Sequence, residues 1–581
     1  MTENHNKRPL AELRSQRWFA SDDIRGFAHR QRTQQMGMRR EEFMGRPVIA
    51  IINTWSEMSP CHAHLRERAE AVKRGVWQAG GYPVELPALS VGEVMVKPTT
   101  MLYRNLLAME CEELLRSHPI DGAVLMGGCD KSTPALLMGA FSMDLPVIYC
   151  PAGPMSNGQW RGVKTGAGTH TKKYWDELRL GSITKDDWID LESRMTRSAG
   201  TCNTIGTATT MTSIADAMGL MLPGASSIPA TDSGHPRMAS LCGTRIVEMV
   251  WEDLKPSRLI TRDSFMNGLV AYMALGGSTN AAVHLIAMAK RLGIALTLDD
   301  MAAMAAKVPV IANVFPSGEY LMEDFYFAGG LTALLNKLSH HLHLDSLTVN
   351  GRTLGDNIAD AACWNDDVIR DEGNPVMPLA RGKTLEVLRG NLAPNGAVMK
   401  SSAASAKFLK HIGPAIVFDD PATMNKTLDD PDLDITEDSV IVLRNAGPVG
   451  APGMPEWGNL PIPKKLLQQG VRDMVRISDA RMSGTHYGTC VLHVAPEAAI
   501  GGPLSLVKTG DLIELDVAAG TLTMKVDEDE LLRRKAAWTP PAKLYDRSFA
   551  ALYQRHVSQA DQGCDFDFLS GTEPVPDPVI F

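Results

Sequence analysis

The stretch MGGCDKSTPA, residues 126–135, places a cysteine, an aspartate and a lysine side by side. The segment before it, DGAVLMGG, is apolar like a buried strand, and the segment after it, STPALLMGAFSMD, is apolar like a helix. Cys129 offers a soft sulfur ligand, Asp130 a hard carboxylate and Lys131 an amine. This junction between a strand and a helix is therefore a candidate site for metal chemistry.

Reactive side chains also follow the two strands predicted upstream. In open parallel α/β sheets, ligands bind beyond the carboxyl ends of the strands, so these side chains are expected to share one edge of a sheet. Together with Cys129 and Asp130, they would bring two cysteines and several oxygen ligands to that edge. The residues after the two upstream strands are Glu57, Cys61, His62 and His64 after strand 46–53, and Glu93 after strand 82–89.

The ligand types suggest two different metals. Thiolates favour zinc or iron–sulfur clusters, whereas carboxylates favour Mg²⁺ or Mn²⁺. Cys202, in RSAGTCNTIGTATTM, lies in a glycine-flanked loop before a predicted helix and could supply a third thiolate. Three cysteines on an iron–sulfur cluster would leave one iron partly open as a Lewis acid for a substrate hydroxyl. Taken singly, Cys61 could also belong to a zinc half-site, Asp130 could cap a helix, and Lys131 could be a solvated surface lysine.

The second half of the chain adds two loops that are rich in small residues, NAGPVGAPGMPEWG (445–458) and ISDARMSGTHYGT (477–489). Small residues let a backbone approach a ligand closely. Ser483 is flanked by Met482 and Gly484 and could be reactive, although an ordinary turn serine is the alternative. Glu456 could be a carboxylate at a helix start or a metal ligand.

The elements that position these residues are predicted from alternating apolar runs. The first third alternates strands with helices, which implies a parallel sheet with helices on both faces. Residues 190–345 are mainly helical, and short Val/Ile/Leu strands with a hairpin at 511–526 follow from about residue 386. We predict an α/β domain at 1–385 that carries the metal sites and a β-rich, barrel-like domain at 386–581 that carries Ser483. The predicted strands of the first domain are 46–53, 82–89, 121–128 and 145–153, and its first helices are 62–81, 100–118 and the segment after Lys131.

Composition excludes several functional classes. The 581 residues have a net charge of −9 and no Lys/Arg-rich run, which argues against a nucleic-acid partner. The polar N-terminus lacks the apolar core of a signal peptide, and the apolar stretch 271–290 is interrupted by polar residues. That stretch favours a buried helix capped near Ser278 over a membrane span. Nine cysteines, no two within four residues, exclude CxxC motifs and a disulfide framework. We expect a cytoplasmic protein that acts on a small molecule.

Seven motifs, in order along the chain, resemble the signatures of the IlvD/EDD dehydratases. This family includes dihydroxy-acid dehydratase, 6-phosphogluconate dehydratase and the sugar-acid dehydratases, and the resemblance runs from about residue 20 to 570. The motifs are NTWSEMSPCHAHL, GGCDKSTPA, LPGASSIPA, LGGSTNAAVHL, GNLAPNGAVMK, GAPGMPE and SDARMSGTHYG.

The resemblance implies removal of water from a 2,3-dihydroxy carboxylate, giving a 2-keto-3-deoxy acid. Mg²⁺ on the carboxylate and C2 oxygen would stabilise the developing enediolate, and a cluster iron would accept the C3 hydroxide. Nine residues match functional positions of the family. They are Cys61, Cys129 and Cys202 as ligands of a [2Fe–2S] cluster, Glu93, Asp130 and Glu456 as Mg²⁺ ligands, Lys131 as a carbamylated lysine that adds a further ligand, and Ser483, with Thr485 as its neighbour, as the serine whose alkoxide takes the C2 proton.

Two segments resemble the sugar-acid branch of the family more than the amino-acid biosynthetic enzymes. They are NTWSEMSPCHAHL and the closing stretch YDRSFAALYQRHVSQADQGCDFDFLSG. The favoured substrate is therefore a pentonate, L-arabinonate first and D-xylonate second. The runner-up is a dihydroxy-acid dehydratase of branched-chain amino-acid biosynthesis, which would need an apolar pocket for its substrate. The family also implies a homotetramer built as a dimer of dimers.

Two functions from other classes are weighed against this interpretation. Ser483 could be the nucleophile of a serine hydrolase, but the GxSxG pattern of a nucleophile elbow is absent around it. The chain could also be a non-catalytic iron–sulfur sensor, which would not need Ser483 beside a full set of Mg²⁺ ligands. Loss of activity in a Ser483→Ala protein with its cluster intact would separate an enzyme from a sensor.

Overall fold

Four parallel strands form the first sheet, each within a few residues of its predicted position. Their order across the sheet is β2-β1-β3-β4, and every pair is parallel. β1 and β3 are buried along their whole length, as expected for central strands with helices on both faces. Because all four run in one direction, the loops after β1, β2 and β3 leave from the same edge. The strands are β1 (Val48–Asn53), β2 (Tyr82–Pro87), β3 (Gly122–Gly127) and β4 (Val147–Pro151).

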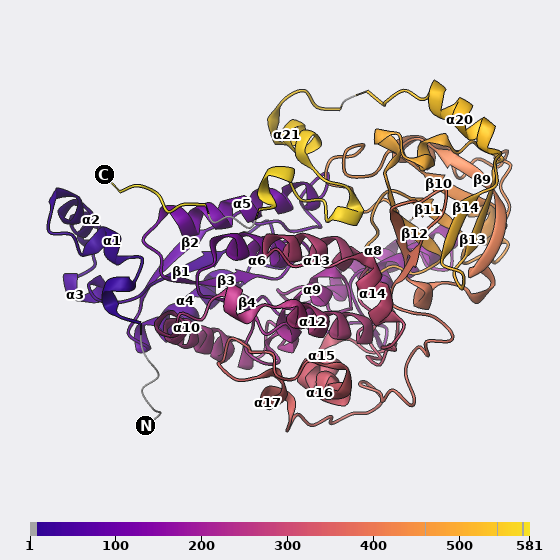
Figure 1. Ribbon diagram of the computed structural model, residues 1–581. Coiled ribbons are helices and arrows are strands. Elements are labelled where there is room, and N and C mark those ends of the chain that lie inside the picture. Colours follow the sequence, from indigo (N-terminus) through magenta and orange to yellow (C-terminus); the bar gives the residue numbers. More distant parts are fainter. Residues whose placement is uncertain (1–7, 459, 543, 572–574, 581) are drawn as a thin grey trace.

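Helices cover both faces of this sheet (Figure 1). One face carries α4 (Leu65–Gln78) and α10 (Gly234–Glu252), and the other carries α5 (Met101–Ser117) and α6 (Ser132–Met143). Ten of the twelve residues of α6 are buried because this helix lies between the sheet, α5 and α13 (Asn280–Arg291). The predicted α/β architecture is confirmed.

The apolar stretch 271–290 contains two helices rather than one. α12 (Arg262–Ala274) ends within it, and α13 begins at Asn280 after a joint of small residues. Gly276 lies in this joint with a φ of +64°, a conformation that breaks the helix. The N-cap residue of α13 is Thr279, one position after the predicted Ser278. The Ser278 Oγ nevertheless accepts a hydrogen bond from the Asn280 amide at 3.3 Å.

The remaining helices of the first two thirds surround this core. They are α1 (Gln16–Phe19), α2 (Ile24–Gln35), α3 (Arg40–Phe43), α9 (Thr207–Ala217), α11 (Pro256–Leu259), α14 (Leu298–Ala305), α15 (Met322–Phe327), α16 (Gly330–Lys337) and α17 (Leu354–Ile358). The helical character predicted for residues 190–345 is confirmed.

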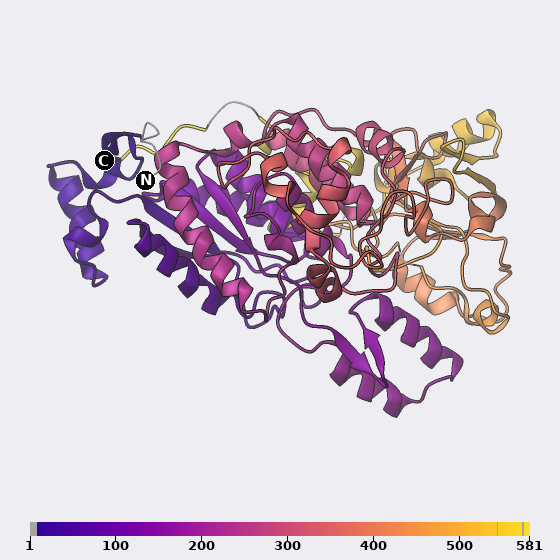
Figure 2. The same ribbon diagram turned by 90° about the horizontal axis from the view of Figure 1, so that it is seen from below.

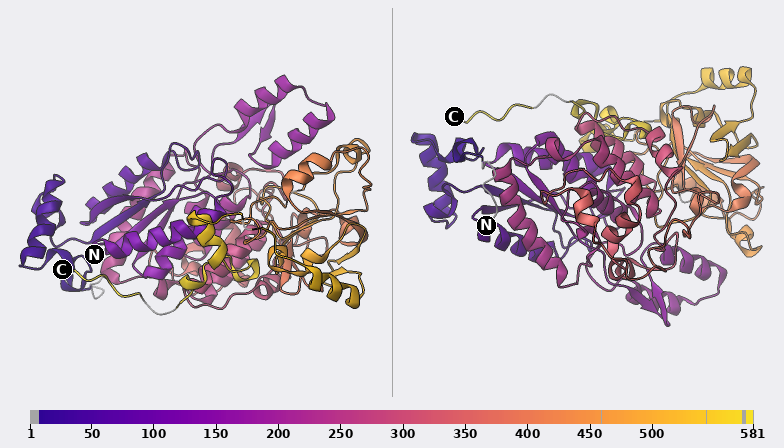
Figure 3. Two further views of the ribbon diagram at one scale, coloured as in Figure 1. Left: turned by 90° about the horizontal axis from the view of Figure 1, so that it is seen from above. Right: turned by 60° about the horizontal axis from the view of Figure 1, so that its bottom comes forward.

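A small arm, residues 158–195, projects from the body of the molecule (Figures 2 and 3). It has its own apolar cluster, in which Trp160 and Tyr174 pack against Leu191 and Met195. The sequence patterns did not predict this unit. Its elements are the antiparallel strands β5 (Gly158–Trp160) and β6 (Val163–Thr165) and the helices α7 (Thr169–Leu180) and α8 (Lys185–Met195).

The second sheet has eight strands in the order β14-β13-β9-β10-β11-β12-β8-β7. Its four central strands, β9 to β12, are parallel, and β13 and β14 form the predicted hairpin. Arg389, just after β7, pairs with Thr521 of β14, so the two edges nearly meet and the sheet is barrel-like, as predicted. The strands are β7 (Glu386–Leu388), β8 (Gly396–Met399), β9 (Lys410–Phe418), β10 (Val440–Leu443), β11 (Arg476–Ser478), β12 (Cys490–Ala495), β13 (Leu512–Asp516) and β14 (Thr521–Met524).

Helices α18 (Pro421–Thr427), α19 (Lys464–Gln468) and α20 (Glu528–Ala537) accompany the second sheet, but α21 (Ser548–His556) returns to the first region. Tyr553 and Phe566 pack against Leu102 of α5, and the buried Arg291 pairs with Asp565 at 2.7 Å. The end of the chain therefore braces the first region. The division at 385/386 stays a prediction.

The structure is a computed structural model that describes residues 8–458, 460–542, 544–571 and 575–580. Residues 1–7, which belong to the polar N-terminus considered above, lie outside the described residues. In the described part of the chain, no helix combines the length and the apolar character that crossing a membrane requires.

Candidate active site

One cavity of about 640 Å³ is lined by loops that follow strands of both sheets. Its wall is built from loops that follow strands β1, β2 and β3 of the first sheet and β10 and β11 of the second. Eight of the nine predicted site residues line it directly, and the ninth, Lys131, is buried against three of them. The lining residues are Cys61, Glu93, Cys129, Asp130, Cys202, Glu456, Ser483 and Thr485.

Lys131 lies at the centre of the three predicted Mg²⁺ ligands. Its Nζ is 2.7 Å from Glu93 Oε2, 3.2 Å from Glu456 Oε1 and 3.4 Å from Asp130 Oδ2. Burial alone lowers the pKa of this amine, but the carboxylates of Glu456, Glu93 and Asp130 outweigh burial and raise the pKa. Lys131 is therefore a charged ammonium inside a cage of carboxylate oxygens.

The carboxylates themselves are held by buried polar side chains. Burial favours the neutral form of Glu456, but the charges of Lys131 and Arg481 prevail and lower the pKa of this carboxyl group. Arg481 Nη1 donates to Glu456 Oε1 at 3.1 Å, and Asn280 Nδ2 donates to the same oxygen at 2.6 Å. Glu93 accepts hydrogen bonds from Thr99 Oγ1, at 3.2 Å, and from Thr100 Oγ1. The cage is thus fixed in position from both halves of the chain.

The three predicted cluster ligands share the same cavity. The neighbouring Cys129 thiol and burial raise the pKa of Cys61, and burial together with Asp130 and Cys129 raises the pKa of Cys202. None of the three forms a disulfide. The backbone N–H of Glu93 points at Cys129 Sγ at 3.5 Å, so this sulfur already has one hydrogen-bond donor. The raised pKa values of Cys61 and Cys202 favour their neutral thiol forms, and a bound metal would displace their protons.

The histidines near Cys61 form hydrogen bonds with the protein itself, and neither they nor the nearby glutamate lines the cavity. His62 Nε2 accepts a hydrogen bond from the Cys129 amide at 3.1 Å, and burial lowers the pKa of His62 to about 3. His64 Nε2 donates to the Ala152 carbonyl at 2.7 Å. Glu57 is exposed and does not line the cavity. His62 therefore helps to position the loop that carries Cys129.

The donor set suits the two metals that the sequence suggested. Three thiols at one wall of the cavity are the soft ligands that an iron–sulfur cluster requires, and three carboxylates around one point are the hard ligands that Mg²⁺ prefers. The residues present therefore fit both groups.

Ser483 faces this cavity from the loop that follows β11. Its Oγ lies 2.9 Å from Thr485 Oγ1, and the Thr485 amide points at the same Ser483 oxygen at 3.4 Å. Glycines let the loop lie this close to its neighbours. A Cβ at Gly484 would approach Ser278 Cβ to 2.4 Å, and one at Gly168 would approach Thr485 Oγ1 to 2.4 Å.

Sequence reasoning missed Arg481, Asn280 and Thr100, although two of them lie inside recognised motifs. Arg481 is in SDARMSGTHYG and Asn280 is in LGGSTNAAVHL, so these motifs could have indicated both residues as members of the site. The cavity also takes one wall from α7, whose residues gave no sequence signal at all.

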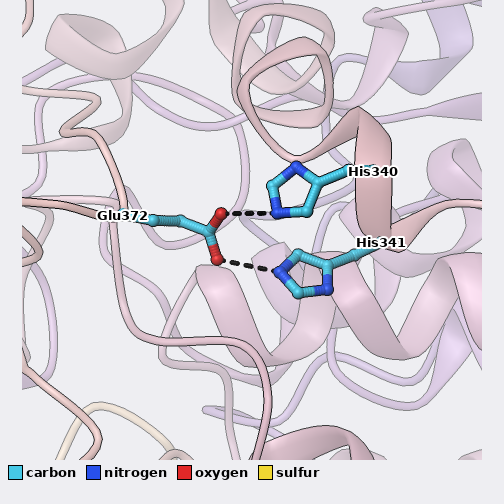
Figure 4. Close-up of side chains that lie close together, drawn as sticks. All are labelled: His340, His341 and Glu372. Atoms are coloured by element: carbon cyan, nitrogen blue, oxygen red, sulfur yellow. Dashed lines mark hydrogen bonds and ion pairs between the residues drawn. The ribbon is translucent and has the colours of Figure 1, made fainter.

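A second group of potential metal ligands lies outside this cavity, where His340 and His341 face Glu372 (Figure 4). Each imidazole Nε2 is 2.8 Å from a different oxygen of the Glu372 carboxylate. His340 is 60% exposed. Because the three side chains satisfy one another by hydrogen bonds, we assign them no part in the chemistry of the cavity.

Comparison with known proteins agrees with this geometry. The family model for the dihydroxy-acid/6-phosphogluconate dehydratase N-terminal region matches residues 46–357, and the model for the C-terminal region matches residues 367–564. A 6-deoxy-6-sulfo-D-gluconate dehydratase of Pseudomonas putida is 70% identical over 580 residues, with 100% of both chains covered.

Relatives with other names are less similar. An L-arabinonate dehydratase of Rhizobium leguminosarum is 50% identical over 96% of both chains. A D-xylonate dehydratase of Caulobacter vibrioides is 37% identical, over 97% of this chain and 96% of the relative. The chain therefore belongs to the dihydroxy-acid/6-phosphogluconate (IlvD/EDD) dehydratase family, and it groups with the sugar-acid dehydratases of that family.

Proposed function

We propose that the protein removes water across C2 and C3 of a sugar acid and releases the 2-keto-3-deoxy acid. Dehydratases of this kind are hydro-lyases, and the family match supports that reaction type. The observation that carries the proposal is the single cavity in which three thiols, a buried carboxylate cage and Ser483 meet.

The chain's own residues would divide the work. Cys61, Cys129 and Cys202 would hold a [2Fe–2S] cluster, while Glu93, Asp130 and Glu456, with a carbamylated Lys131, would hold Mg²⁺. When bound, these groups supply Lewis acidity for the departing C3 hydroxyl and for the carboxylate end of the substrate.

Ser483 would move the proton. Its Oγ, as the alkoxide, accepts the proton from C2 while the C3–OH bond breaks, and the resulting enol tautomerises to the 2-keto acid. Thr485 Oγ1, at 2.9 Å, stabilises the negative Ser483 oxygen by donating a hydrogen bond. The proton from C2 and the hydroxide from C3 together account for the water released.

The substrate we favour is 6-deoxy-6-sulfo-D-gluconate, because the 70% identical relative bears that name. L-arabinonate, which the sequence motifs favoured, is the second candidate, since two relatives named for it are 50% identical, and D-xylonate follows at 37%. Relatives named dihydroxy-acid dehydratase are 37–38% identical, so branched-chain amino-acid synthesis is a weaker alternative.

An assay of 2-keto acid release with protein purified under low oxygen and supplied with Mg²⁺ tests this function. The substrates are 6-deoxy-6-sulfo-D-gluconate, D-gluconate, L-arabinonate, D-xylonate and 2,3-dihydroxyisovalerate. We expect the highest kcat/KM with the sulfonated acid. Preference for dihydroxyisovalerate would contradict the sugar-acid assignment, and failure to release a keto acid from any of the five would contradict the reaction.

Thr485→Val tests the hydrogen bond to Ser483. Valine keeps the shape of threonine but cannot donate, and a hydrogen bond to a charged oxygen contributes about 1.5–3 kcal/mol, so kcat should fall by about 10- to 100-fold. Iron and magnesium contents should stay at wild-type values. Thr427→Val, at an exposed position of α18, is the control. A Thr485→Val kcat equal to that of the control would contradict the role of Thr485.

A cytoplasmic location and a homotetramer, built as a dimer of dimers, complete the proposal. Both are supported by the family resemblance alone. Size-exclusion chromatography with light scattering measures the assembly, and a mass near four times 63.1 kDa is expected.

A further inference from the structure

Helix α7 belongs to the projecting arm (Figures 2 and 3). One face of this helix lines the cavity. The residues of α7 that line the cavity are spaced three and four apart, as one face of a helix requires. They are Thr171, Lys172, Trp175, Asp176 and Arg179. The arm is held in place at both ends of α7, since Thr169 Oγ1 donates to the Thr485 carbonyl at 2.7 Å and Arg179 donates to the Ile462 carbonyl at 3.4 Å.

The two cations on this face differ in their partners. Arg179 is paired with Asp429 at 3.2 Å and lies 3.8 Å from Asp176, so its charge is already used to anchor the arm. Lys172 is half-buried, and among the described residues no carboxylate lies within ion-pair distance of its Nζ. Burial lowers the pKa of Lys172, with Asp176 opposing that effect. Lys172 thus presents an ammonium to the cavity without a protein counter-ion in contact.

Lys172 lies apart from the proposed metal ligands in its contacts. The carboxylates of Glu93, Asp130 and Glu456 pair with Lys131, and Glu456 also pairs with Arg481. Among the described residues, none of these carboxylates lies within ion-pair distance of Lys172 Nζ. The cavity therefore has a second cation, on the wall formed by α7, that the proposed metal ligands do not neutralise.

We propose that Lys172 Nζ binds a tetrahedral oxyanion at the end of the sugar acid remote from its reacting carboxylate. This inference rests on the proposed function and names a specificity determinant for it. A sulfonate and a phosphate share the required chemistry, and a pentonate, which ends in a hydroxyl, leaves the lysine without an anion. A lysine without a counter-ion in the cavity would thereby gain one.

Steady-state kinetics of Lys172→Met on a matched pair of substrates test the proposal. The pair is 6-deoxy-6-sulfo-D-gluconate and D-gluconate, which differ only in the terminal group. For the sulfonated acid we expect kcat/KM to fall by about 10- to 100-fold, mostly through KM, because a charged hydrogen bond is lost. The fall for D-gluconate should be much smaller. Lys172→Arg should retain more activity on the sulfonated acid than Lys172→Met.

Lys173→Met is the matched control, because Lys173 is the exposed neighbour on the same helix. An equal loss on both substrates, or no loss on the sulfonated acid, would overturn the assignment. Preference for 6-phospho-D-gluconate that Lys172→Met abolishes would support the oxyanion site and identify phosphate as its ligand.

Binding without turnover gives a second readout. The metal-loaded Ser483→Ala protein is titrated calorimetrically with 6-deoxy-6-sulfo-D-gluconate, with and without Lys172→Met. We expect Kd to rise by about the same factor as KM. An unchanged Kd would overturn the inference. If the wild-type protein dehydrates D-gluconate and L-arabinonate but Lys172→Met has no selective effect, the distal site fails while the proposed function stands. If the wild-type protein dehydrates no sugar acid, the proposed function itself fails.

Discussion

Ser483→Ala should lower kcat by about 10²- to 10⁴-fold, the range that a positioned general base contributes. Alanine removes the only oxygen of this side chain and leaves Thr485 without its partner at 2.9 Å. The substitution removes no proposed metal ligand, so iron and magnesium contents should equal those of the wild-type protein. The measurement is kcat for 2-keto acid release together with metal analysis of the same preparation.

Ser117→Ala is the control for this prediction, because Ser117 lies at the exposed end of α5. Its Oγ donates a hydrogen bond to the Glu113 carbonyl and lies 3.0 Å from His118 Nδ1. Retention of more than about a tenth of wild-type kcat by Ser483→Ala would contradict its role as the base. A wild-type protein that binds a cluster but turns over no sugar acid would favour the sensor.

Cys129→Ser should abolish both the visible absorbance and the activity. Cys129 is buried, and its loop is fixed by the hydrogen bond from its amide to His62, so its sulfur cannot be replaced by another thiol. A serine hydroxyl is a harder and more weakly acidic ligand than a thiol, and it holds iron–sulfur clusters poorly. Iron per chain, measured after purification under low oxygen, should fall to near zero.

Cys363→Ser is the matched control, because Cys363 is half-buried, does not line the cavity, and donates a hydrogen bond to the Ile369 carbonyl at 3.7 Å. This protein should keep wild-type iron and activity. If Cys129→Ser retained its full iron content, the thiol assignment would be wrong. If Cys363→Ser lost iron as well, the effect would reflect general instability rather than a ligand.

The fold was predictable where local pattern and topology agree. The apolar runs of β1 and β3 are each followed, after a loop, by a helix, and such alternation permits few arrangements other than a covered parallel sheet. From that sheet it follows that Cys61, Glu93 and Cys129 lie at one edge, which the structure confirms. Ser483 and Glu456 follow the same logic, since their loops leave neighbouring parallel strands β11 and β10.

Other features depend on long-range packing that no local pattern records. The return of α21 to α5 joins residues more than 400 positions apart, and the pairing of Arg291 with Asp565 is visible only in the folded chain. The roles of Arg481 and Asn280 likewise come from their contact with Glu456 rather than from spacing. The arm was missed because its short strands and its helices bury only a small cluster of their own.

Substrate recognition depends on such long-range features most of all. Lys172 becomes a candidate for substrate recognition only because α7 turns this residue toward a cavity whose other walls come from distant segments. The motifs that resemble the family lie around the proposed metal ligands and Ser483, and they therefore say little about the far end of the substrate.

The most direct test of the account is an NMR analysis of the product formed in D₂O by the wild-type protein, purified under low oxygen, from 6-deoxy-6-sulfo-D-gluconate. The account predicts a carbonyl at C2 and a C3 methylene that carries one deuteron, because the enol takes its new proton from solvent. A product with its carbonyl elsewhere, or unchanged substrate from a protein that contains both iron and magnesium, would contradict it.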